Sequence, residues 1–120
     1  MPRRDPRERL ADIVEAGEAI AGYVVGFDID SFRLDRRTVD AVLRNITVIG
    51  EAARSIPDEI RDRQTAIPWV EIADMRNVVV HEYFGVDLDI LWRTVTTELP
   101  GLIEQLRALI ADLGSNSERE

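Results

Sequence analysis

Residues 76–83 read Arg-Asn-Val-Val-Val-His-Glu-Tyr and contain the only histidine of the 120-residue chain. The chain has no cysteine, so His81 is its one side chain with an unperturbed pKa close to neutral pH. Arg76 carries forked donors that match phosphate oxygens, and Asn77 can orient an imidazole or a phosphate. Tyr83 can donate a hydrogen bond or a proton. Metal-free cleavage of an RNA phosphodiester needs a base, a cation for the phosphate and an acid, and this octet holds residues of each type.

A helix would bring the polar side chains of the octet to one side. At about 100° per residue they share one broad arc, whereas Val78 and Val79 point away. Asn77 and His81 are an i,i+4 pair that can touch directly. Acid–base cleavage generally uses two proton carriers, and the chain has one histidine. A two-fold symmetric dimer would supply the second copy, so we expect a homodimer with a composite site across its interface.

The octet also has purely structural interpretations. His81, with Asn77 four residues before it, could be a hydrogen-bonded pair on a surface or at an interface. Arg76 could form an ordinary surface ion pair with Glu82 or Asp74, and the tyrosine of the octet could lie in the core. From residue types alone, these interpretations stand beside the chemical one.

Metal and cofactor chemistry finds little support in the sequence. One histidine and no cysteine are too few for the usual ligand sets. Asp87 and Asp89 stand at a predicted helix start, where capping explains them. We therefore expect neither a metal nor another cofactor. Trp69 and Trp92 are expected to be anchors in the core or at an interface.

Length and composition indicate one domain, since compact domains most often hold about 100–150 residues. The start of the chain lacks the apolar stretch of a secretory signal, and no apolar run approaches the roughly 20 residues that span a bilayer. We expect a soluble cytoplasmic protein without a membrane segment. The net charge is −8, and all fifteen basic residues are arginine. Because general phosphate neutralisation usually requires a basic surplus, any RNA contact must be local.

Apolar residues recur at helical spacing along almost the whole chain and predict four main helices. The first runs from about residue 10 to residue 24. The second is capped by Asp35 or a neighbour and continues to about residue 56. Residues 26–34 lose the pattern, and Pro57 opens a short polar stretch of one or two helical turns.

The third helix carries the octet. Pro68 suits its first position, because the missing N–H would have no partner there, and Gly85 is placed to end it after Phe84. Asp87 is expected to cap a fourth helix. Within that helix Pro100 predicts a kink or a break near residues 97–99.

These elements predict an all-α fold, a dimerising up-and-down bundle of four to five helices over residues 1–113. Residues 114–120 are small and charged and are expected to form a short flexible tail. We find no strand-like alternation long enough to matter, no internal repeat and no low-complexity tract. Residues 78–80 are β-prone in isolation, but the helical period continues through them.

The octet and several other segments resemble one known family. Arg, four residues, His, one residue and Tyr, with Asn after the arginine, is the pattern of HEPN-domain proteins of the HepT-like type. These proteins are toxin subunits of bacterial and archaeal toxin–antitoxin pairs. Further landmarks of the family stand in their usual order between about Leu10 and Leu113: Arg37–Asn45, Ile49–Ala53, Ile67–Trp69, Tyr83–Asp87 and Leu99–Pro100.

The resemblance implies a helical-bundle homodimer with metal-independent RNase activity, attributed in the family to the arginine and histidine of the motif. These roles carry over to Arg76 and His81, with Asn77 in support. The resemblance also implies a partner, a small nucleotidyltransferase antitoxin of the MntA type, which transfers AMP from ATP to the motif tyrosine. That residue is Tyr83 here, so O-AMP-tyrosine is expected at this position. The added AMP would fill the cleft and neutralise Arg76.

Two other functions stay open beside the RNase toxin. The bundle could be a non-catalytic module that docks a nucleotidyltransferase or a nucleotide through residues 76–83. It could also be a structural bundle whose octet is only an interface. For the RNase toxin, the acidic net charge favours a narrow RNA substrate, and every position of the motif is present.

Overall fold

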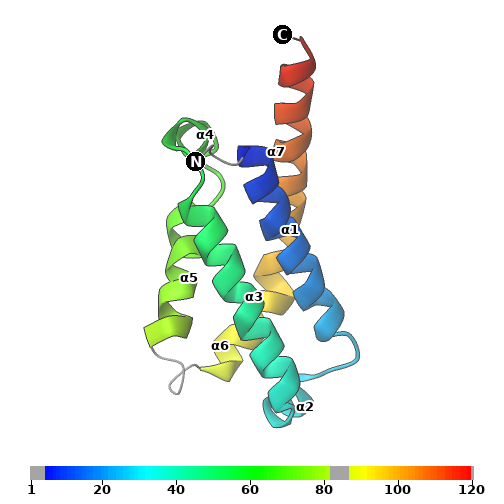
Figure 1. Ribbon diagram of the computed structural model, residues 1–120. Coiled ribbons are helices and arrows are strands. Elements are labelled where there is room, and N and C mark those ends of the chain that lie inside the picture. Colours follow the sequence, from blue (N-terminus) through cyan, green and yellow to red (C-terminus); the bar gives the residue numbers. More distant parts are fainter. Residues whose placement is uncertain (1–4, 82–86, 120) are drawn as a thin grey trace.

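The computed structural model describes residues 5–81 and 87–119, with side chains for residues 5–75 and 87–114. Every regular element in these ranges is helical (Figure 1). The elements are α1 (Pro6–Tyr23), α2 (Ile29–Leu34), α3 (Arg36–Arg54), α4 (Asp58–Arg63), α5 (Trp69–His81), α6 (Leu88–Arg93), η2 (Thr94–Glu98) and α7 (Leu99–Arg119). The predicted all-α fold is confirmed.

The four long helices form an up-and-down bundle. α3 lies between α5 and α1, and α1 packs in turn against α7 (Figure 1). Successive long helices run in opposite directions. The short helix α4 lies at one end of the bundle, and α2 and α6 lie at the other. The prediction of four main helices, with a short helical stretch after Pro57, is therefore confirmed.

α3 has the central place because a wide face of it is apolar. Asp35 caps it as predicted, since its carboxylate accepts a hydrogen bond from the N–H of Thr38 over 3.0 Å. The helix buries Val39, Val42, Leu43, Ile46, Ile49, Gly50, Ala52 and Ala53. At 100° per residue these positions cover about half of the helix circumference, so α3 packs against α1 on one flank and α5 on the other.

Residues 29–34 form the short helix α2, where the sequence pattern predicted none. The Asp28 carboxylate accepts a hydrogen bond from the N–H of Ser31 over 2.8 Å, and the Ser31 hydroxyl accepts one from the N–H of Asp28 over 3.0 Å. The hydrogen bond from the Ser31 N–H is the largest cause that lowers the pKa of the Asp28 carboxyl. The helix buries Phe32, whose ring centroid lies 5.1 Å from that of Trp92. Six residues are too few to show a helical period, so the cap pair was the usable signal.

The irregularity expected before Pro100 takes the form of a wide turn. α6 continues into η2, a π-helical turn over Thr94–Glu98, and then into α7, so the chain stays helical without a break. Pro100 has no N–H to donate to the carbonyl of residue 96, which removes one α-helical bond at this point. Three threonine hydroxyls donate to carbonyl oxygens four residues back: Thr94 to Ile90, Thr96 to Trp92 and Thr97 to Arg93.

The last helix is longer than predicted. α7 continues to Arg119, so its backbone includes most of the segment that was expected to be a tail after residue 113. The flexibility of residues 114–120 stays a prediction. In the described part of the chain, no helix is both long and apolar enough to cross a membrane.

Candidate active site

The octet begins in the C-terminal part of α5. Arg76, Asn77 and His81 all belong to this helix, and the last two stand about one turn apart. The helical prediction for residues 76–81 is therefore confirmed, including the β-prone valines. The side chains of residues 76–81, and the whole of Tyr83, lie outside the described residues. The shared polar arc therefore stays a prediction.

The N-terminal end of α5 is fixed by Pro68 and Trp69. The Pro68 carbonyl accepts the first bond of the helix, from the N–H of Ile72 over 3.0 Å. Pro68 is thus the N-cap residue and not, as predicted, the first helical residue. The Trp69 indole N–H donates to the Gln64 carbonyl over 3.1 Å, and Trp69 is 6% exposed. Ile72, one turn further along α5, is 2% exposed and is also part of the core. Trp69 is confirmed as a core anchor.

The turn before α5 is also held by α7. The side-chain amide of Gln105, on α7, donates to the carbonyl of Ala66 over 3.4 Å. The next residue, Ile67, is buried in the core. Because α7 packs along α1, this contact ties the start of α5 to the other side of the bundle.

The described chain resumes after the octet at Asp87, which caps α6 as predicted. Its carboxylate accepts hydrogen bonds from the N–H groups of Asp89 over 2.9 Å and Ile90 over 3.2 Å. Asp89 forms an ion pair with Arg33 of α2, and the hydrogen bond between them raises the pKa of the Arg33 guanidinium. Both aspartates are thus used for capping and pairing. Among the described residues, no group of three or more histidine, aspartate or glutamate residues gathers closely enough to hold a metal ion.

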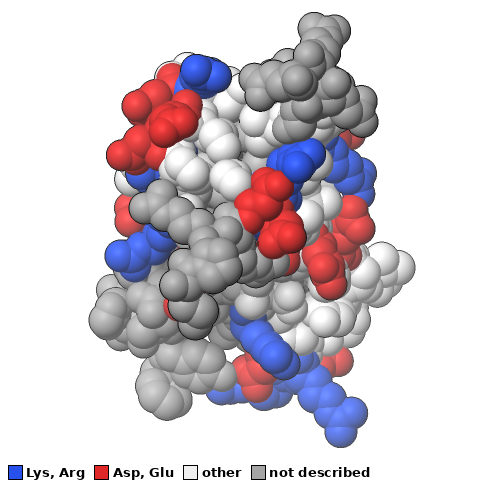
Figure 2. All heavy atoms as spheres, turned by 45° about the horizontal axis from the view of Figure 1, so that its top comes forward, with Lys and Arg blue, Asp and Glu red and all other residues white. Residues whose placement is uncertain are grey.

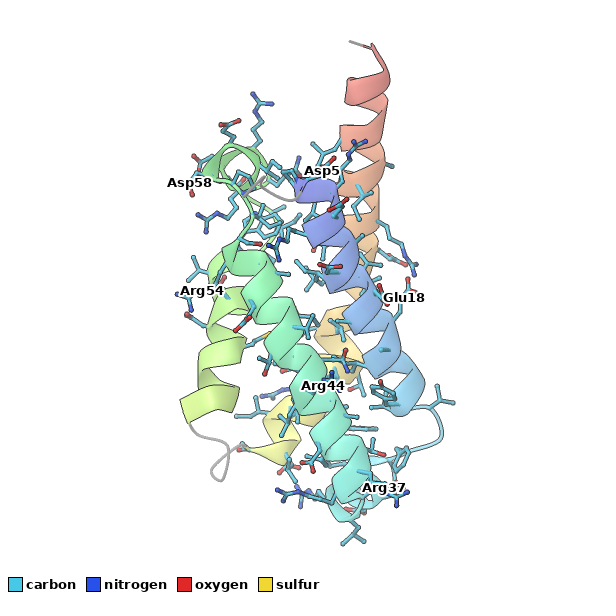
Figure 3. All side chains as sticks on the ribbon, viewed as in Figure 1. Asp5, Glu18, Arg37, Arg44, Arg54 and Asp58 are labelled. Atoms are coloured by element: carbon cyan, nitrogen blue, oxygen red, sulfur yellow. The ribbon has the colours of Figure 1, made fainter. Side chains whose placement is uncertain are left out.

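α3 is the helix that flanks α5. Figure 3 shows Arg44 near its middle and Arg37 near its start, with Arg54 at the end beside the upper part of α5. None of these three arginines forms an ion pair with a described residue, although Arg36 pairs with Asp40 over 3.2 Å. The helix of the octet therefore lies next to a helix that carries unpaired positive charge.

The fold is a helical bundle, and the two residues that could carry its chemistry, Arg76 and His81, belong to one helix, α5. The sequence profile of the family described as Ribonuclease HepT-like matches residues 13–109, a range that contains α3, α5 and the octet. The chain belongs to this HepT-like ribonuclease family.

Three relatives agree with this assignment. The chain is 39% identical to the probable ribonuclease HepT of Thermococcus cleftensis, over 88% of this chain and 98% of the relative. It is 36% identical to a candidate RNase of Caldanaerobacter subterraneus subsp. tengcongensis, over 89% and 96% of the two chains. It is 32% identical to a candidate RNase of Methanocaldococcus jannaschii, over 98% of both chains. No solved structure matches the chain significantly.

Proposed function

We propose that this protein is an endoribonuclease that cleaves RNA without a metal and acts as the toxin of a toxin–antitoxin pair. The observation that carries the proposal is the match to the HepT-like ribonuclease family over residues 13–109, which includes the whole octet. A second support is that α5 stays helical through His81. The arginine, asparagine and histidine of the motif therefore share the last two turns of one helix.

The reaction uses His81 as base or acid. As the base it takes the proton of a 2′-hydroxyl, whose oxygen attacks the neighbouring phosphorus while the bond to the 5′-oxygen breaks. A second proton carrier protonates that 5′-oxygen, so the products are a 2′,3′-cyclic phosphate and a 5′-hydroxyl. Arg76 stabilises the charge that builds on the phosphate, and Asn77 orients the imidazole or the phosphate.

The second proton carrier comes from a second copy of the chain. Each chain holds one histidine, so a homodimer brings two of them to one composite site. A two-fold interface pairs like elements, and an interface at the C-terminal end of α5 would place both copies of His81 close to one RNA phosphate.

The activity is silenced by a partner nucleotidyltransferase of the MntA type, which transfers AMP from ATP to Tyr83. The tyrosine oxygen attacks the α-phosphorus of ATP and pyrophosphate leaves. Tyr83 follows His81 by two residues, so the AMP group stands close to the motif. Its negatively charged phosphodiester neutralises Arg76, and its base takes up space beside the motif that RNA would need.

Expression in cells tests the proposed function. The wild-type chain without its antitoxin should arrest growth and degrade RNA, and His81→Ala and Arg76→Ala should each lose both effects. Arg93→Ala is the matched control, because Arg93 is an exposed arginine of α6 outside the octet, and this variant should stay toxic. Equal arrest and equal RNA integrity for wild type and His81→Ala would contradict the proposal.

The net charge of −8 favours one second candidate, a non-catalytic module that binds a nucleotidyltransferase or a nucleotide. In that case AMP on Tyr83 regulates assembly and not catalysis. Wild-type toxicity of the Arg76→Ala, His81→Ala double variant would support this candidate over the RNase.

A further inference from the structure

α3 differs in charge from every other helix that the structure describes. It holds four arginines, Arg36, Arg37, Arg44 and Arg54, against one aspartate and one glutamate, so its net charge is +2. The other described helices are neutral or acidic, and the whole chain has a net charge of −8. Among the described helices α3 is thus the one with a net positive charge, and it packs against the helix of the octet.

Four arginines on other helices are already used in ion pairs. Arg7 pairs with Asp5, Arg33 with Asp89, Arg61 with Asp58 and Arg107 with Glu18. Arg37 and Arg44 have no such partner among the described residues, and both are exposed. Their forked donors are therefore available to a ligand.

Arg37 and Arg44 lie on one stripe of α3. They are seven residues apart, which corresponds to two helical turns, an offset of about 20° and a separation of about 10.5 Å along the axis. Figure 3 shows both on the face of α3 that is turned away from the core. In Figure 2 arginine atoms gather towards the lower edge of the visible face, at the end of the bundle where α2 and the start of α3 lie in Figure 1.

We propose that Arg37 and Arg44, the α3 arginine pair, bind phosphates of the RNA strand that flanks the scissile bond. This inference rests on the proposed RNase function. Guanidinium groups spaced along one helix face contact successive parts of a phosphate backbone, and such contacts position a strand without reading its sequence. A local basic stripe also explains how a chain of net charge −8 holds RNA next to α5.

RNA binding tests the α3 arginine pair directly. The parent protein is the full chain with His81→Ala, a substitution that prevents cleavage of the RNA. Its Kd for a fluorescently labelled single-stranded RNA is measured by anisotropy over a series of salt concentrations. Adding Arg37→Gln and Arg44→Gln should raise the Kd at least about tenfold and reduce the slope of log K against log salt by about 1.4, for two lost contacts.

The matched control is Arg9→Gln with Arg63→Gln, in the same His81→Ala chain. It makes the same change in net charge, and both arginines lie at the end of the bundle that carries α4 (Figure 1). Its Kd should stay within about twofold of the parent chain. Equal weakening by the two pairs would overturn the inference, because general charge and not position would then set the affinity.

Two further outcomes separate this inference from the proposed function. If the wild-type chain cleaves RNA but the Arg37→Gln, Arg44→Gln chain keeps its Kd, the inference fails alone. The same holds if light scattering shows that these substitutions change the oligomeric state without changing the Kd, since the stripe is then an interface. If the wild-type chain neither binds nor cleaves RNA, the proposed function and the inference fail together.

Discussion

A single histidine limits what residues 76–83 can do within one chain. His81 carries one proton at a time, whereas RNA cleavage removes one proton and delivers another. Arg76 cannot take the second role, because its guanidinium stays protonated in proteins. The prediction of this chemistry rests on residue types, since few side chains can perform it near neutral pH. The mutual orientation of the side chains could not be predicted in the same way, because rotamers depend on packing against other elements.

Tyr83 is the residue at which we predict that the RNase activity is regulated. When the chain is expressed with the proposed partner nucleotidyltransferase and ATP, intact mass should rise by AMP increments, and peptide sequencing should locate them on Tyr83. Tyr83→Phe should show no increment and should stay toxic in the presence of the partner, because its ring lacks the oxygen that accepts AMP. RNA cleavage by Tyr83→Phe without the partner should stay close to wild type. An unmodified Tyr83 beside an active partner would leave neutralisation by simple binding as the better account.

At the scale of the elements, long helices could be predicted from their apolar pattern more readily than short ones. α1, α3, α5 and α7 each span several turns, so their buried faces are visible as periodic residues in the sequence. α2 has six residues and was missed, although its cap residues Asp28 and Ser31 were readable. Pro68 was misplaced by one position, because proline suits both a helix start and the residue before it. The form of the turn before Pro100 depends on its packing and could not be read from one proline.

The contact between α1 and α7 gives a prediction on helix packing. A Cβ atom on Gly17 would lie 2.9 Å from Cγ1 and Cδ1 of Ile103, whereas a Cβ on Gly22 would meet nothing within 4 Å. Both glycines are in α1, where alanine gains up to about 1 kcal/mol of helix propensity. Gly22→Ala should keep or raise stability. Gly17→Ala should be about 1–3 kcal/mol less stable than Gly22→Ala, because Ile103 has to shift.

Urea unfolding of the two alanine variants measures this difference. Equal midpoints and equal slopes would contradict the prediction. They would show that Ile103 moves aside for a methyl group on Gly17 without loss of unfolding free energy, so that the close packing of α1 and α7 does not depend on Gly17.

At the scale of the whole molecule, the family could be identified from sequence because its landmarks are spread over nearly the full chain in a fixed order. The match over residues 13–109 confirms that identification. The distribution of charge could not be predicted as readily, since the net charge does not tell where charged side chains without an ion-pair partner lie. The +2 of α3 against −8 for the chain can be counted from the sequence, but only the structure shows that Arg37 and Arg44 have no ion-pair partner among the described residues.

The proposed homodimer leads to a prediction about mixed subunits. If each site uses both copies of His81, a chain with His81→Ala inactivates every dimer it joins. After equimolar mixing and subunit exchange, about a quarter of the dimers hold two wild-type chains, so activity should fall to about a quarter of that of the same total amount of wild type. Independent subunits would keep about half. Titrating one chain into the other and measuring RNA cleavage separates the two cases.

The central claim is that His81 cleaves RNA, and purified protein tests it most directly. Unmodified wild type and His81→Ala should be incubated with end-labelled RNA in the presence of EDTA, and the product ends identified by mass. We predict cleavage by wild type with 2′,3′-cyclic phosphate ends, and a loss of at least about 100-fold in the His81→Ala variant. Equal cleavage by both proteins, or cleavage that EDTA abolishes, would contradict the account.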